Sequence, residues 1–149
     1  MRRVAVFLLA LLVTYVLAAA AATQSVMARL AEMGIVVTLD HRLTATGHDL
    51  VGMASSFLPL LALSLLIAFL VTTLINRWVS GWRTTLFVLA GATAVICVHV
   101  GLKIALDITP VAAARSVSGL VVQALAGAAG GFIFALATAS DWRRRTSHG

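Results

Sequence analysis

Four long apolar stretches constrain this chain more than any other feature of its sequence. Each holds about the 20 residues that an α-helix needs to cross a bilayer, and they cover residues 4–22, 50–75, 84–106 and 111–139. Within lipid every backbone polar group needs an internal partner, which a helix provides. The sequence therefore predicts an all-α integral membrane protein, a four-helix bundle of transmembrane helices that forms a single membrane domain.

The composition supports this class and leaves little chain for a soluble domain. Only 11% of the residues are charged, compared with about a quarter in soluble proteins, and the mean hydropathy is +1.05. The chain has one cysteine, Cys97, which excludes an internal disulfide and a CxxC redox centre.

The positive charges predict the orientation of the bundle. On one side of the spans arginines dominate, and on the other side basic and acidic residues balance. The first side carries Arg2, Arg3, Arg77, Arg83, Arg143, Arg144 and Arg145 with Asp141; the second carries Arg29, Arg42, Lys103 and Arg115 with Glu32, Asp40, Asp49 and Asp107. Basic residues concentrate on the cytoplasmic side of membrane proteins, so we expect both termini in the cytoplasm and a bacterial-type inner membrane. This placement explains the net charge of +6 and excludes nucleic acid as a partner.

The first apolar stretch allows two interpretations. Behind Arg2 and Arg3, residues 4–22 end in a run of alanines that fits a signal-peptide cleavage site. Their uninterrupted length also fits a retained first span, which we favour. Cleavage would leave three spans and would not change the rest of the topology.

The segment between the first two spans, residues 23–47, is expected outside the membrane. In its first part apolar residues recur at helical spacing, which predicts a short amphipathic helix on the outer surface, ended by Gly34. The apolar face of this helix would consist of Val26, Met27, Leu30 and Met33. Residues 35–43 are expected to form a loop.

The second span is expected to start near Leu50. Thr46 and Asp49 fit a capping box, in which their side chains satisfy free backbone donors at the start of a helix. Pro59 would then lie well inside the span, where it removes a backbone hydrogen bond and kinks the helix.

The third and fourth spans are predicted to form a tight antiparallel hairpin, with Thr109 and Pro110 at the start of the last helix and a short cytoplasmic tail, residues 140–149, after it. In the last span Gly119, Gln123, Gly127, Gly131 and Ala135 follow at four-residue steps, a mostly small row that includes the GxxxG of Gly127 and Gly131. Such a row lets another helix approach closely. The approaching helix can belong to the same chain or to a second copy.

Ionisable residues near the end of the third span mark the candidate site. His99, Lys103 and Asp107 are four residues apart and share one face of a helix. An ionisable residue inside a span costs roughly 2.5–3.5 kcal/mol on insertion scales, so three on one stripe need partners or a function. Lys103 and Arg115 should lie at similar depth across the hairpin. The other polar residues that can reach this stripe are Gln123, Asp49, His48 and Tyr15.

We expect these side chains to form one charge network beneath the external face. In it the two aspartates neutralise Lys103 and Arg115, and His99 and Gln123 bond at its inner edge. One interpretation gives the network a structural role, in which it holds four helices in register. The other makes it a binding site, open to the outside, for a phosphate or carboxylate group of a small anion or lipid headgroup.

Other chemistries receive less support from the sequence. His41 and His48, with their neighbouring aspartates, match no established metal-ligand spacing, and a haem between His48 and His99 would need both at one depth. No serine lies in a nucleophile motif such as GxSxG, and no pair of carboxylates lies within a span. We therefore predict no metal and no cofactor, and we favour a function without catalysis because no catalytic motif is found.

The function predicted from sequence is that of a small accessory or scaffold protein. It would lie in the lipid bilayer and pack with itself, as a homo-oligomer, or with another membrane protein. The alternative is a carrier or receptor for an anionic molecule or lipid headgroup at the polar cluster. An enzyme that acts on a lipid is the third hypothesis.

Overall fold

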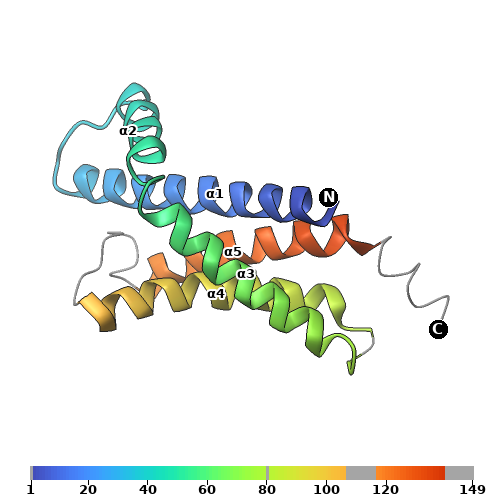
Figure 1. The fold of residues 1–149 in the computed structure, drawn as a ribbon. Helices are drawn as coiled ribbons and strands as arrows, with labels where there is room; N and C mark the ends of the chain where they lie inside the picture. Colours follow the sequence, from blue (N-terminus) through green and yellow to red (C-terminus); the bar gives the residue numbers. More distant parts are fainter. Residues whose placement is uncertain (1, 80, 107–116, 140–149) are drawn as a thin grey trace.

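The computed structural model describes residues 2–79, 81–106 and 117–139 and places them in a bundle of α-helices (Figure 1). Four of these helices are long and apolar enough to cross a membrane, and a shorter one follows the first. The helices are α1 (Arg2–Glu32), α2 (Leu39–Gly52), α3 (Phe57–Ile75), α4 (Arg83–Leu106) and α5 (Val117–Ala137). The predicted all-α class, with four candidate spans, is confirmed.

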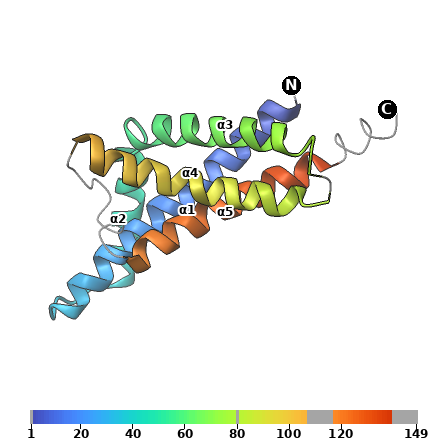
Figure 2. The ribbon, with the colours of Figure 1, turned by 90° about the horizontal axis from the view of Figure 1, so that it is seen from below.

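The bundle is organised around α5. This helix contacts α4 along one side and α1 along the other, while α3 packs mainly on α4 and touches α1 less. Helix α2 contacts α1 and runs across it, away from the direction of the long helices (Figure 1). The turned view shows α3 on one flank of the bundle and α1 running obliquely past α4 and α5 (Figure 2). The start of α1, the turn from α3 to α4 and the end of α5 therefore lie at one end.

Glycines bring α4 and α5 into backbone contact. A Cβ atom on Gly127 would overlap the carbonyl oxygen of Gly91, a Cβ on Gly91 would overlap that of Gly127, and a Cβ on Gly131 would overlap that of Phe87. The GxxxG face of the last span is thus occupied by α4 of the same chain. Gly130 faces the other way, where a Cβ would overlap the Thr14 hydroxyl of α1. Small residues therefore set both of the closest helix contacts.

Helix α1 is longer than expected. The predicted shorter helix after the first span is present as α2, but its expected position directly after residue 22 is wrong, because those residues continue α1 without a break to Glu32. Thr23 and Ser25, at the expected boundary, donate their hydroxyls to carbonyl oxygens one turn earlier and remain helical. The helix does end at Gly34, as predicted. Gly34 has a φ of +83°, and the amides of Gly34 and Ile35 bond back to Ala31 and Leu30 in a Schellman motif.

The shorter helix lies later in the chain than expected. Residues 35–43 do not form a continuous loop, since α2 begins at Leu39 with Thr38 as its N-cap, whose hydroxyl accepts a hydrogen bond from the His41 amide. The predicted capping box is also wrong: the Thr46 hydroxyl donates to the Arg42 carbonyl inside α2. Thr38 is a favourable N-cap residue, and a helix therefore starts after it although the residues directly before it are β-branched.

The second long helix starts at Phe57 rather than near Leu50. Pro59 is consequently the third residue of α3 and not an interior residue. A backbone N–H at this position would have no partner within the helix, so proline removes no helical hydrogen bond there and the reason for the predicted kink does not apply. Helix α4 agrees with the expected third span to within one residue. The expected hairpin at Thr109 and Pro110 and the tail after residue 139 lie outside the described residues.

We predict that Gly91→Ala destabilises the bundle by about 1–3 kcal/mol, because the added methyl group forces α4 and α5 apart. Gly101→Ala, on the same helix, is the matched control. Nothing lies within 4 Å of its Cβ position, so this variant should be as stable as the native chain or slightly more stable. Thermal unfolding in detergent measures both, and equal melting temperatures would contradict the close contact.

Candidate functional site

The predicted polar cluster lies only partly within the described residues. Asp107 and Arg115 fall outside them, so the charge network centred on these two residues remains a prediction. Lys103 is exposed on α4. Phe87 faces Gly131 and Gly91 faces Gly127. The same register, continued along both helices, places His99 at the level of Gly119.

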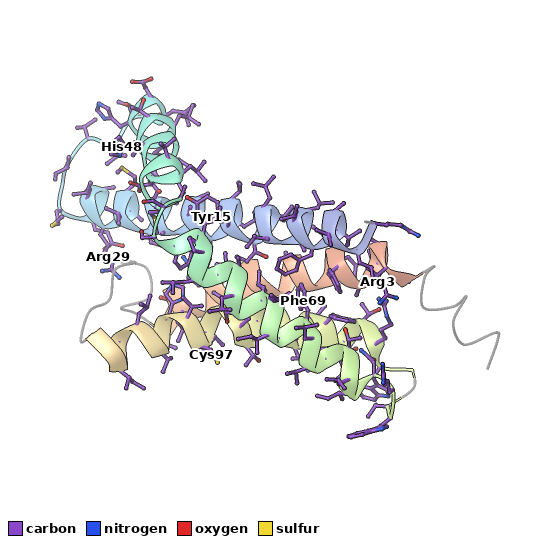
Figure 3. The ribbon with its side chains drawn as sticks, in the orientation of Figure 1. Arg3, Tyr15, Arg29, His48, Phe69 and Cys97 are labelled. Atoms are coloured by element: carbon purple, nitrogen blue, oxygen red, sulfur yellow. The ribbon has the colours of Figure 1, made fainter. Side chains whose placement is uncertain are left out.

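Two members of the cluster attach α2 to α1. The Tyr15 hydroxyl donates to the Leu50 carbonyl, which is among the last carbonyls of α2 and has no partner within that helix. The Thr23 hydroxyl has one proton, which it shares between the Ala19 carbonyl of its own helix and the Asp49 carboxylate, 2.7 Å away. Figure 3 shows Tyr15 beneath α2, whereas the exposed His48 lies on the part of α2 that projects from the bundle. Asp49 and Tyr15 therefore have a positioning role, and His48 is not brought to them.

The two buried members of the cluster bond to backbone rather than to each other. The Gln123 side-chain nitrogen donates to the Ala18 carbonyl over 2.9 Å and so joins α5 to α1. His99 Nδ1 lies 2.8 Å from the Val95 carbonyl, which can only accept, so Nδ1 carries the proton. His99 Nε2 and Gln123 Oε1 have no partner among the described residues. The Phe57 ring packs against both Tyr15 and His99, with centroids 6.4 and 5.6 Å apart.

These contacts give the described part of the cluster a mainly structural character. The bonds of Tyr15, Gln123 and His99 join a side chain to helix backbone, and the Thr23–Asp49 bond joins two side chains. Hydrogen bonds between helices contribute about 0.6 kcal/mol on average in membrane proteins. Among the described residues no group of three or more histidine, cysteine or acidic side chains could hold a metal ion.

The opposite end of the bundle carries a second polar constellation, which we call the arginine end: Arg2, Arg3, Arg77 and Arg83. Two of these arginines cap α5. Arg83 donates to the Ala135 carbonyl and to the Thr138 hydroxyl, and Arg2 donates to the Ala137 carbonyl. The last carbonyls of a helix have no internal partner and carry partial negative charge, so cations there are favourable.

A small cavity lies beside this cap. Its volume is about 40 Å³, enough for about three oxygen-sized groups, since one water needs about 10–15 Å³. The lining residues are Arg3, Thr73, Asn76, Arg83, Phe87, Phe134 and Thr138. They come from all four long helices and from the residue that ends α3. Figure 3 shows Arg3 at this end of the bundle.

Asn76 is the unusual residue of the cavity. It is 3% exposed, and neither its side-chain nitrogen nor its side-chain oxygen has a hydrogen-bond partner among the described residues. A buried polar group without a partner costs about 1–3 kcal/mol. An unpartnered amide beside two guanidinium groups makes this cavity a candidate site for a polar ligand.

The charge of the cavity favours an anion. Arg3 and Arg83 both line it, and the described acidic residues (Glu32, Asp40 and Asp49) belong to the other end of the bundle. Asp141 lies outside the described residues. Guanidinium donors and an asparagine amide nitrogen match the acceptor oxygens of a phosphate or carboxylate.

An apolar groove continues from the cavity along the surface between α1 and α3. Its volume is about 390 Å³, and it shares Arg3, Thr73 and Phe134 with the cavity. The other lining residues are Val4, Phe7, Leu66, Phe69 and Leu70. Phe69 stacks on Phe134 with ring centroids 4.6 Å apart and contacts Phe7 edge-on, so aromatic rings form its floor.

This site was not among those expected from the sequence, where Arg3 and Arg83 served as evidence for orientation and Asn76 was not considered as a site residue. One signal was available: Asn76 is the chain's only asparagine, directly follows an apolar span and lies seven residues before Arg83. Comparisons of the chain with protein-family models, curated proteins and solved structures found no match.

We predict that Tyr15→Phe loosens α2 without disturbing the long helices. Loss of the bond to the Leu50 carbonyl should increase amide hydrogen exchange in α2 about threefold, as expected for about 0.6 kcal/mol. Exchange in α4 and α5 should not change. Hydrogen–deuterium exchange mass spectrometry measures both regions, and a uniform increase over all helices would mean that Tyr15 stabilises the whole bundle instead.

Proposed function

We propose that this multi-pass membrane protein is a small non-enzymatic receptor or carrier that binds an anionic group at its arginine end. The observation that carries the proposal is the buried, unpartnered Asn76 amide in a cavity lined by Arg3 and Arg83. This assignment keeps the anionic ligand expected from the sequence, but it moves the site from the predicted polar cluster to the opposite end of the bundle.

The positive-inside tendency supports an orientation with the arginine end on the cytoplasmic side. Both chain termini would then be cytoplasmic, α2 would lie at the external surface, and the cavity would open at the inner leaflet of the cell membrane. Anionic lipids give that leaflet surface a negative potential, which attracts basic residues by about 1 kcal/mol each. A phosphate or carboxylate would therefore be concentrated where Arg3 is placed.

Retention of anionic phospholipid tests the proposal. The full chain is purified in an uncharged maltoside detergent with phosphatidylglycerol and phosphatidylcholine, and bound lipid is measured by native mass spectrometry. We expect preferential retention of phosphatidylglycerol and a decrease of about fivefold in Arg3→Gln, because one arginine contributes about 1 kcal/mol. The proposal fails if the native chain shows no preference between the two lipids.

Two further variants separate binding from charge and from folding. Arg77→Gln removes the same charge from the same end, but Arg77 is exposed and does not line the cavity, so retention should persist. Asn76→Leu should reduce retention while thermal stability stays equal or rises, because it removes an unpartnered buried amide. Equal losses in Arg3→Gln and Arg77→Gln would mean that only surface charge attracts the lipid.

The accessory or scaffold function expected from the sequence is the second candidate. The outward face of α4 supports it, because Thr93, Cys97 and Gly101 are exposed there at four-residue steps. Small side chains at this spacing, threonine included, let helices of two proteins approach closely. The inward face of α4, with Gly91, is already used by α5.

Cys97 provides a probe of such an interface. If α4 meets α4 of a second copy, copper-phenanthroline oxidation in membranes should give a disulfide-linked dimer, since the Cβ atoms can reach about 3.5–4.5 Å. Gly101→Leu should reduce the dimer by blocking the approach, whereas Val100→Leu, at the neighbouring exposed position, should not. A chain that stays monomeric on gels after oxidation would contradict self-association through α4.

A further inference from the structure

The groove beside the cavity assigns a lipid tail to the anionic ligand. Resting on the proposed function, we propose that the ligand is an anionic membrane lipid whose headgroup binds Arg3, Arg83 and Asn76. One of its acyl chains lies in the groove between α1 and α3. The ligand would then enter sideways from the bilayer rather than from water.

Continuity between cavity and groove supports this inference. The two spaces share Arg3, Thr73 and Phe134, so a molecule with its polar group in the cavity directs its remainder into the groove. Beyond Arg3 and Thr73 the groove is lined only by aliphatic and aromatic side chains. A soluble anion would use the cavity alone and would leave this apolar surface without a role.

The depth of the groove fits one leaflet. On α3 the lining residues Leu66, Leu70 and Thr73 follow helical spacing and share one face. Leu66 lies ten residues before Asn76, which is about 15 Å along the helix axis. The hydrocarbon core of a bilayer is about 30 Å thick, so the groove reaches from the arginine end to the middle of the membrane. This distance equals the thickness of one leaflet of the hydrocarbon core, which is the depth that an acyl chain of that leaflet spans.

The weak packing of α3 against α1 explains why the groove exists. Helix α3 packs mainly on α4 and makes few contacts with α1. The space left between α3 and α1 is the groove, whose lining includes the stacked rings of Phe69 and Phe134. Figure 3 shows Phe69 beside α3 and Arg3 at the neighbouring end of α1. A volume of about 390 Å³ is within the range of about 300–1,000 Å³ that small-molecule sites occupy.

A tryptophan reporter in the groove tests the position of the acyl chain. The three native tryptophans are replaced by phenylalanine, and Leu70→Trp is introduced. The chain is reconstituted in phosphatidylcholine nanodiscs that contain a minor fraction of phosphatidylglycerol with brominated acyl chains. Bromine quenches tryptophan fluorescence only at close range. We expect the quenching to show that brominated phosphatidylglycerol is about fivefold enriched beside the Leu70→Trp reporter relative to its fraction in the whole nanodisc, because one arginine contact contributes about 1 kcal/mol.

A matched reporter defines the bulk level. Ile67→Trp is on the same helix at nearly the same depth and is similarly exposed (54%, compared with 58% for Leu70), but Ile67 does not line the groove. Its quenching should follow the bulk fraction of brominated lipid. A second pair on α1, Val4→Trp in the groove and Leu8→Trp outside it, keeps the test valid if Leu70→Trp closes the groove.

Exchange of the label and of the arginine completes the experiment. With bromine on phosphatidylcholine instead, the groove reporters should be quenched less than their controls. Arg3→Gln should bring the groove reporters to the bulk level, and Arg77→Gln should not. Equal quenching of groove and control reporters by brominated phosphatidylglycerol would overturn the acyl-chain assignment.

Failure of the acyl-chain assignment can be distinguished from failure of the proposed function. If lipid retention depends on Arg3 but the reporters sense only bulk lipid, an anionic headgroup binds at the arginine end and its chain lies elsewhere. If phosphatidylglycerol retention also does not change in Arg3→Gln, the cavity holds only water and both proposals fail. Retention of soluble butyl phosphate as strong as that of phosphatidylglycerol would assign the site to a water-borne anion.

Discussion

The backbone contact between α4 and α5 at Gly91 and Gly127 is the constraint on which the rest of the bundle depends. Lipid gives helices no hydrophobic reason to associate, so association requires close packing or hydrogen bonds. The glycines provide the packing, and side chains that bond to neighbouring backbones, such as Gln123 to Ala18, provide the hydrogen bonds. Helix α3 lacks a comparable glycine contact, and the groove between α3 and α1 results from this difference.

The two polar regions satisfy their buried groups differently. In the half of the bundle near α2, the Tyr15 hydroxyl and the Gln123 side-chain nitrogen each donate to a backbone carbonyl, although His99 Nε2 and Gln123 Oε1 have no partner among the described residues. At the arginine end the C-terminal carbonyls of α5 are satisfied, but the Asn76 amide in the adjoining cavity is not. A polar group that folding leaves without a partner is where a ligand contributes most.

The four spans could be predicted because their length and apolarity follow from the thickness of a membrane. The boundaries of α1 and α2 could not, because the fall in hydropathy near Thr23 does not end the helix, which continues to Glu32. Pro59 was misplaced for the same reason: its role depends on where α3 starts. The cavity requires α1, α3, α4 and α5 to converge on Asn76, and separate hydropathy patterns cannot show that convergence.

The length of α1 has a mechanical consequence. Its 31 residues extend about 46 Å, well beyond the hydrocarbon core, and it is a single unbroken helix. One end carries Arg3, and the other holds α2 through Thr23. If α1 tilted in a thinner bilayer, α2 at one end of this helix and Arg3 at its other end would move at the same time. The two ends of the bundle are thus coupled through one stiff element.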